Sequence, residues 1–169
     1  IELDVVHDDY VPDTSLELFG HQFDLPVFAS PIAKILTDYE YPSQYFNNNN
    51  AYARALLEGC YEAGGMAWLG DNKAEGYFEG QIEAIRDIDG VGVPTIKPWA
   101  DRDEFWKRVK WCNEVGAMAI ATDLDAIGLG YQYPGDPNSK REGACARNVE
   151  ELKEIVRWVD KPDIIKGIM

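Results

Sequence analysis

The sequence is poor in positive charge, and this deficit limits the partners that the protein can have. Its 169 residues include 16 lysines and arginines against 30 aspartates and glutamates, a formal net charge of -14. A surface with this balance repels phosphate backbones and anionic lipids, so we expect no nucleic acid and no membrane as partner. No apolar run approaches the ~20 residues that cross a bilayer, and no basic segment precedes a short apolar stretch. The sequence therefore predicts a soluble protein.

Cysteines and glycine-rich nucleotide motifs are also scarce. The three cysteines, Cys60, Cys112 and Cys145, are odd in number and form no C-x-x-C pair, so neither a disulfide framework nor a metal site is indicated. This composition favours a reducing, cytoplasmic location. No G-x-G-x-x-G or P-loop follows a predicted strand, which argues against the nucleotide-binding doubly wound folds. Because the first residue is Ile1 rather than methionine, we expect a fragment.

Five short apolar runs alternate with four helical patterns. The runs predict strands within residues 26–32, 65–70, 93–99, 117–125 and 163–169. The helical patterns start near Asn50, Phe78, Asp101 and Asn148, and the last includes a capping box with Glu151. Strands that are apolar on both faces and joined through helices are parallel. We therefore predict an α/β fold, an incomplete (β/α)8 TIM barrel, with an N-terminal extension or cover over 1–25 and about five strands with four helices over 26–169.

Charged residues fall at the predicted C-terminal ends of three strands, where the working residues of a parallel barrel lie. Lys97 ends the third strand, Asp123 and Asp125 end the fourth, and Lys166 lies in the fifth. Because neighbouring strands are ~4.8 Å apart, these side chains can converge. A charge in an apolar barrel mouth is costly unless it is paired or used. Two interpretations stay open: an ion-pair network that only closes the barrel, or a functional site.

Three ordered blocks of the sequence resemble one family of flavin enzymes. The blocks are S-L-E-L-F-G-H-Q-F-D-L-P-V-F-A-S-P-I-A (15–33), E-V-G-A-M-A-I-A-T-D-L-D-A-I-G-L-G (114–130) and N-V-E-E-L-K-E-I-V-R-W-V-D-K-P-D-I-I-K-G-I-M (148–169). They are similar to the FMN-dependent α-hydroxy acid oxidases and dehydrogenases, the family of glycolate oxidase and lactate oxidase, over the N-terminal half of its barrel or slightly more. The resemblance implies FMN as cofactor and hydride transfer from a 2-hydroxy acid or related small metabolite.

The resemblance also assigns roles by position. Lys166 matches the lysine that stabilises the negative charge of the reduced flavin and is the expected catalytic residue. Lys97 and Tyr131 take the places of a substrate-binding tyrosine and arginine. The family's catalytic histidine and phosphate-binding loops come after the position of Lys166, so we expect this fragment alone to be inactive. The expected cofactor-binding residues are Pro31, Ile32, Ala33, Gly70, Thr95, Asp123 and Lys166.

Departures from the family pattern keep other functions open. Thr95 stands where the family has a glutamine, and Asp123 stands where it has a threonine. With the substrate-binding tyrosine and arginine also replaced, the substrate is open and the chain is a divergent member. One alternative is a lysine-dependent aldolase or isomerase that uses Lys97 or Lys166 as Schiff-base nucleophile. The other is a non-catalytic half-barrel that self-associates through its open edges, and a homo-oligomer stays open in either case.

Overall fold

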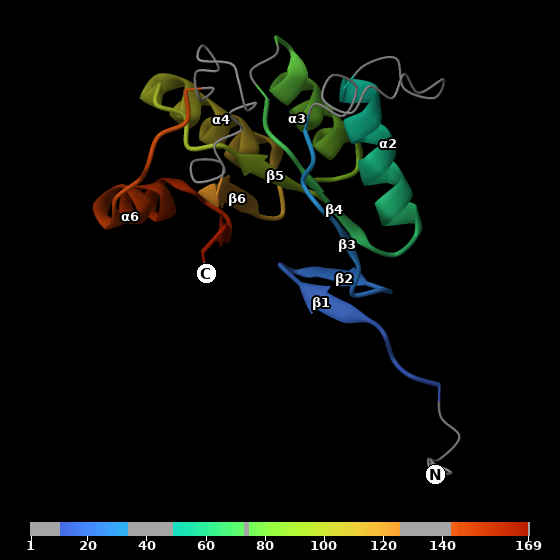
Figure 1. Cartoon of the computed structure of the whole chain (residues 1–169). Coiled ribbons are helices and arrows are strands. Elements are labelled where there is room, and N and C mark those ends of the chain that lie inside the picture. Colours follow the sequence, from blue (N-terminus) through green and yellow to red (C-terminus); the bar gives the residue numbers. More distant parts are fainter. Residues whose placement is uncertain (1–10, 34–48, 73–74, 126–142, 169) are drawn as a thin grey trace, which may run out of the picture.

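A parallel sheet of five strands organises the molecule (Figure 1). The computed structural model describes residues 11–33, 49–72, 75–125 and 143–168. The strand order is β3-β4-β5-β6-β7, and each adjacent pair is parallel. The strands are β3 (Phe28–Ala29), β4 (Met66–Leu69), β5 (Val93–Ile96), β6 (Ile120–Asp123) and β7 (Asp163–Lys166). All five predicted strands are present, although each is shorter than its apolar run.

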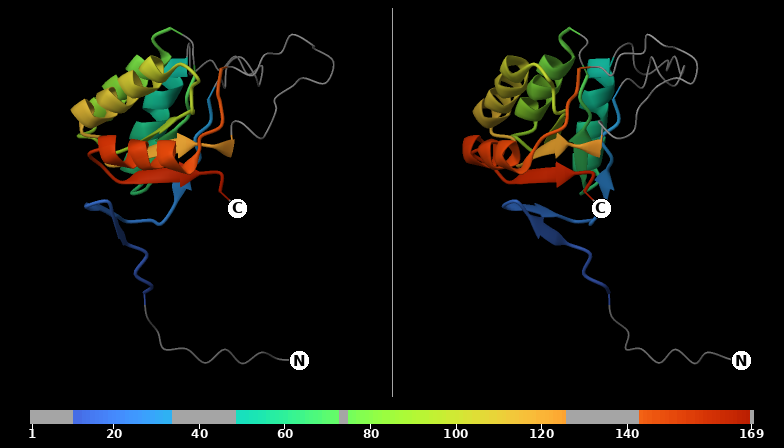
Figure 2. Two further views of the ribbon diagram at one scale, coloured as in Figure 1. Left: turned by 90° about the vertical axis from the view of Figure 1, so that its left-hand side faces the viewer. Right: turned by 60° about the vertical axis from the view of Figure 1, so that its left-hand side comes forward.

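Helices connect consecutive strands and lie along one face of the sheet (Figure 2). They are α2 (Asn49–Glu62), α3 (Tyr77–Asp87), α4 (Arg102–Val115) and α6 (Val149–Trp158). Ile96 and Ile120 point toward this layer and are buried with Phe105 of α4 and Ile155 of α6. This arrangement of a parallel sheet with helices on its outer face is that of part of a TIM barrel. Within the described residues, no helix is both long and apolar enough to span a membrane.

Three helix ends confirm the local sequence signals. Asp101 caps α4, and its side chain accepts hydrogen bonds from two backbone N–H groups of the first turn. The helix stops at Gly116, whose φ of 74° suits glycine. Asn148 caps α6, and the reciprocal bond from Glu151 completes the predicted capping box. Each such cap stabilises a helix by about 1 kcal/mol, so these residues fix where the connections between strands begin.

A short hairpin covers the N-terminal end of the sheet. Strands β1 (Leu16–Leu18) and β2 (His21–Phe23) pair in antiparallel register and lie below the sheet in Figure 1. Phe23 is 3% exposed and packs with Met66 and Val93, the first residues of β4 and β5. The hairpin therefore sits at the end of the sheet opposite to the one where the charged strand ends lie. The division of the chain into an extension over 1–25 and a barrel over 26–169 stays a prediction.

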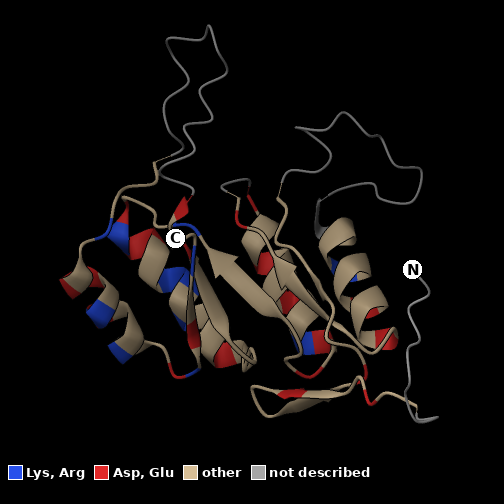
Figure 3. Cartoon of the chain, turned by 60° about the horizontal axis from the view of Figure 1, so that its bottom comes forward, with Lys and Arg blue, Asp and Glu red and all other residues tan. Residues whose placement is uncertain are grey.

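The inner face of the sheet points away from the helices. Side chains alternate along a strand, so the face opposite to Ile96 and Ile120 carries Thr95 and Ala121. Charged residues lie mainly on the helices and loops, and the strands carry few of them (Figure 3). Among the described residues no strand pairs with the outer edge of β3 or of β7. Ligands of barrels bind at the C-terminal end of such an inner face, which directs attention to the ends of β4 to β7.

Candidate functional site

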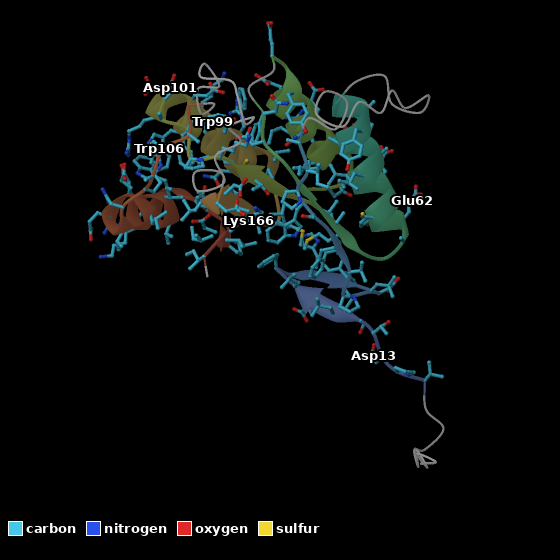
Figure 4. All side chains as sticks on the ribbon, in the orientation of Figure 1. Asp13, Glu62, Trp99, Asp101, Trp106 and Lys166 are labelled. Carbon is cyan, nitrogen blue, oxygen red and sulfur yellow. The ribbon has the colours of Figure 1, made fainter. Side chains whose placement is uncertain are left out.

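An ion-pair cluster joins the C-terminal ends of β6 and β7. The parallel register places Asp123 directly opposite Lys166. The Lys166 Nζ donates to Asp123 Oδ1 at 2.7 Å and to both carboxylate oxygens of Asp125 at 2.8 Å. The lysine side chain is 29% exposed, and Figure 4 shows it beside the end of β6. One ammonium group is therefore shared by two carboxylates at the open end of the sheet.

The backbone conformation and close packing at position 167 explain why Lys166 is followed by a glycine. Its φ is +90°, and a Cβ atom there would come within 2.4 Å of the Asp125 Cβ and 2.7 Å of the Asp125 backbone nitrogen. The Leu124 N–H also donates to the Lys166 carbonyl oxygen at 3.0 Å. The residues after β6 are thus pressed against the end of β7. This close packing fixes the Asp125 carboxylate beside the ammonium group of Lys166.

The charges of this cluster do not balance. Burial raises the pKa of Asp123 to about 6, and a hydrogen bond with Asp125 adds to the rise, although Lys166 opposes it. Burial lowers the pKa of Lys166, but its hydrogen bonds to Asp123 and Asp125 outweigh that effect and raise it. Lys166 is therefore fully protonated near neutral pH. With both carboxylates ionised the three side chains carry a net charge of about -1.

Two buried polar atoms on the inner face lack a partner within the described part of the chain. They are Thr95 Oγ1 and Trp68 Nε1. Thr95 is 1% exposed and lies opposite Ala121, two residues before Asp123 on β6. Trp68 lies opposite Val93 on the neighbouring strand. Since buried polar groups normally form hydrogen bonds, these two atoms mark a place where a polar ligand group would be stabilised.

The segment after β3 packs onto the end of β4. A Cβ atom on Gly70 would lie 2.7 Å from the Ala33 backbone nitrogen and 2.8 Å from the Ile32 carbonyl carbon. Gly70 follows Leu69, which pairs with Pro94, so it stands at the level of Thr95. A larger residue at position 70 would push the Ile32–Ala33 backbone away. The absence of a side chain therefore brings the predicted cofactor-binding segment close to the sheet end.

Of the two expected substrate contacts, the structure describes Lys97 but not Tyr131. The Lys97 Nζ lies 5.7 Å from the ring centroid of Trp99, and its backbone N–H donates to Asp71 Oδ2 at 2.9 Å. The sequence allowed Lys97 to converge with Lys166, but the contacts described for Lys97 are with Asp71 and Trp99. Tyr131 lies outside the described residues. A substrate-binding role for either residue stays a prediction.

Sequence reasoning missed a second, fully buried polar cluster around Asp71. This carboxylate accepts hydrogen bonds from the Lys97 N–H, from Trp99 Nε1 at 2.7 Å and from Arg108 Nη1. Arg108 extends from α4 and also donates through Nε to Glu104 Oε1 at 2.9 Å. Burial raises the pKa of Asp71 to about 6, although Arg108 opposes the rise. The position of Asp71 directly after a predicted strand was the signal that could have found it.

The Asp71 cluster lies on the helix side of the sheet. Trp99 is fully buried among the residues that pack between the sheet and α4, and Figure 4 shows it on that side. Arg108 lies over the Phe78 and Trp99 rings, with its Cζ atom 4.8 and 5.3 Å from their centroids. All these partners come from the protein itself. The cluster therefore ties the loop after β4 and the end of β5 to α4.

The fold and the charged strand ends together define a protein with part of a TIM-barrel architecture. Solved structures of α-hydroxy acid oxidases share this architecture. A protein of Pediococcus acidilactici described as a lactate oxidase is 16% identical, with a TM-score of 0.64 over 94% of this chain and 45% of its own. A mandelate oxidase is 19% identical, with a TM-score of 0.63 over 97% of this chain and 47% of its own. A mandelate oxidase variant solved with an FMN adduct gives a TM-score of 0.59 at 19% identity, over 92% of this chain and 44% of its own.

The extent of the match limits what it shows. No family model matches the sequence, and no curated protein matches it. At these identities the likeness shows the fold, and the chain spans less than half the length of the oxidases that it matches. The resemblance predicted from the sequence is confirmed, because the structural neighbours are lactate and mandelate oxidases. The partial TIM barrel is confirmed with it.

Proposed function

We propose that the protein is an FMN-dependent oxidoreductase that oxidises a 2-hydroxy acid or a related small metabolite. The observation that carries the proposal is Lys166, a protonated lysine at the C-terminal end of β7 beside the inner face of the sheet. The fold likeness to oxidases, one of them solved with an FMN adduct, supports the choice of cofactor. The unpartnered Thr95 and Trp68 atoms support a polar ligand on the same inner face of the sheet.

The residues present fit a flavin. Backbone groups of Ile32 and Ala33, packed on Gly70, would lie along the ring, and the Thr95 hydroxyl would hydrogen-bond a polar edge. Lys166 would place its positive charge near the edge of the ring that becomes negative on reduction. FMN, when bound, supplies the two-electron acceptor for a hydride from the substrate's α-carbon. The protein's own contribution is orientation and charge.

The lysine-dependent aldolase is the weaker interpretation. A Schiff-base lysine needs a depressed pKa so that its amine is neutral and nucleophilic. The hydrogen bonds to Asp123 and Asp125 instead raise the pKa of Lys166. The same contacts that support an electrostatic role for this lysine therefore oppose a nucleophilic one.

The experiment that tests the proposal is a visible absorption spectrum of the protein purified at its natural length, followed by single-turnover reduction of any bound flavin. We expect flavin absorption near ~450 nm, with or without added FMN. Lys166→Met should slow flavin reduction by about tenfold to a hundredfold, because the fixed cation is lost. Lys153→Met is the control, since Lys153 pairs with Glu150 on the surface of α6.

Two results would contradict the proposal. A protein that stays colourless after FMN is added does not bind the cofactor. If the Lys166→Met protein binds FMN and reduces it as fast as the unaltered protein, Lys166 does not have the role assigned to it.

A further inference from the structure

Asp123 is the residue by which the charged cluster departs from the pattern of the resembled family. We propose that Asp123 controls the charge that the site presents to the flavin. When ionised, Asp123 accepts a hydrogen bond from Lys166 and its negative charge disfavours the reduced cofactor. When protonated, Asp123 loses that charge and no longer disfavours the reduced cofactor. This inference rests on the proposed function and concerns how the same site is regulated. It assigns a tuning role to a residue that touches the lysine rather than the substrate.

The geometry of the hydrogen bonds supports this role. A lysine ammonium has three N–H donors. The Lys166 Nζ makes three contacts with carboxylate oxygens, at 2.7 Å to Asp123 and at 2.8 Å to each oxygen of Asp125. In this arrangement all three donors are used within the cluster. A ligand can therefore receive a hydrogen bond from Lys166 only if one carboxylate loses its own hydrogen bond to the ammonium group.

Asp123 is the carboxylate that can lose its hydrogen bond to Lys166. Asp125 binds the ammonium through both oxygens, and its backbone is pressed against Gly167. Asp123 contributes a single oxygen from the last position of β6. A proton taken from water by Asp123 removes its charge and turns its carboxyl group into a hydrogen-bond donor. The cluster then changes from a net charge of about -1 to about zero without moving Asp125.

The surroundings of Asp123 place this protonation near physiological pH. The charged groups described around it are Lys166 from β7 and Asp125 from the residues after β6. The other neighbouring strand, β5, contributes Lys97, whose ammonium group lies over the Trp99 ring. Burial, with Asp125 adding to it, raises the pKa of Asp123 to about 6 against the opposing effect of Lys166. The proton is therefore gained as the pH falls from 8 to 5.

The consequence for the flavin is electrostatic. The reduced cofactor carries negative charge, so a neighbouring cluster with a net charge of about -1 disfavours it and a neutral cluster does not. A unit charge in contact across a partly buried site shifts such an equilibrium by about tenfold. The ratio of reduced to oxidised flavin affinity is therefore expected to be about tenfold lower with Asp123 ionised.

The experiment measures the midpoint potential of the bound flavin in the holoprotein at pH 8 and pH 5, for the unaltered protein, Asp123→Thr and Asp123→Asn. At pH 8 both variants should favour the reduced flavin by about tenfold, which is about 30 mV for a two-electron couple. At pH 5 the difference should largely disappear. Asp163→Asn is the matched control, because Asp163 opens β7 opposite Ile120, on the helix side and at the other end of the strand.

The possible results separate this inference from the proposed function. A yellow protein whose potentials are the same in all three forms at both pH values overturns the role of Asp123 but leaves flavin binding intact. A colourless protein overturns both. If neither Asp123 variant folds, the unaltered protein and Asp163→Asn still test the role of Asp123, because both keep this residue. In both proteins the ratio of reduced to oxidised flavin affinity should be about tenfold higher at pH 5 than at pH 8, and a ratio that is the same at the two pH values would overturn the role of Asp123.

Discussion

Replacing Arg108 by methionine is expected to destabilise the protein strongly. The Arg108 and Asp71 side chains are 5% and 0% exposed, so the ion pair between them is shielded from water. Methionine keeps much of the apolar stem of arginine but removes its charge. Ionised Asp71 would then keep only the hydrogen bonds from the Lys97 N–H and Trp99 Nε1. A buried charge without its counter-ion is one of the most costly defects that a single substitution can produce.

The magnitude follows from the burial of the pair. Breaking a buried ion pair by removing one partner costs about 3–5 kcal/mol. The two remaining hydrogen bonds to Asp71 offset part of this cost, so we expect Arg108→Met to lose about 3 kcal/mol at pH 7. The lost contact of the guanidinium with the Phe78 and Trp99 rings adds to the loss. Such a change is a large fraction of the total stability of a domain.

The assay is urea unfolding followed by tryptophan fluorescence at pH 7 and pH 5. Arg54→Met is the control, because Arg54 pairs with Glu58 and Asp87 while its side chain is 43% exposed, and it should cost under about 1 kcal/mol. Without Arg108 the pKa of Asp71 rises further, and the protonated form carries no charge. The deficit of Arg108→Met should therefore shrink as the pH falls from 7 to 5. A loss no larger than that of Arg54→Met, or one unchanged at pH 5, would refute this reasoning.

Two further substitutions test features near β7. Burial raises the pKa of Asp163 to about 6. The contribution of Asp163 to the stability of the folded protein is therefore most favourable below about pH 4 and is lost as the pH rises through 6. Asp163→Asn should remove this fall and, after discounting for partial exposure, gain about 1 kcal/mol at pH 7, as measured by denaturation at both pH values. Gly167→Ala should cost at least about 2 kcal/mol in thermal unfolding, because its Cβ would clash with Asp125. Gly20→Ala, with φ of +79° but open space around it, should cost about half as much, and equal losses would contradict the clash.

The parts of the fold that the sequence predicted well are those determined by local interactions. The capping box of Asn148 and Glu151 and the stop at Gly116 depend on residues within one turn, and the structure shows both. Strand limits were less accurate: the apolar run over 117–125 contains a strand only at Ile120–Asp123. Met118 is buried, but its N–H donates to the Gly90 carbonyl rather than to a neighbouring strand. Apolar character reports burial, and it does not report which residues join the sheet.

The same distinction applies to the site. The contact of Asp123 with Lys166 could be expected because parallel strands align their C-terminal ends. The contact of Asp71 with Arg108 joins residues 37 positions apart, and Arg108 interrupts a helix stripe of apolar residues. Nothing local to Arg108 shows that its guanidinium turns inward to a carboxylate. Only the packing of α4 on the sheet brings the two together.

The two polar clusters differ in whether the protein satisfies them, and this difference separates structure from function. On the helix side, the Asp71 carboxylate receives three donors from the chain itself, so it needs no ligand to be stable. On the inner face, Thr95 Oγ1 and Trp68 Nε1 have no partner among the described residues. At the C-terminal ends of β6 and β7, the Lys166 cluster carries more negative than positive charge. A buried polar atom without a partner costs about 1–3 kcal/mol, and a bound ligand with matching groups would recover that cost. The inner face would therefore gain stability from binding a polar cofactor.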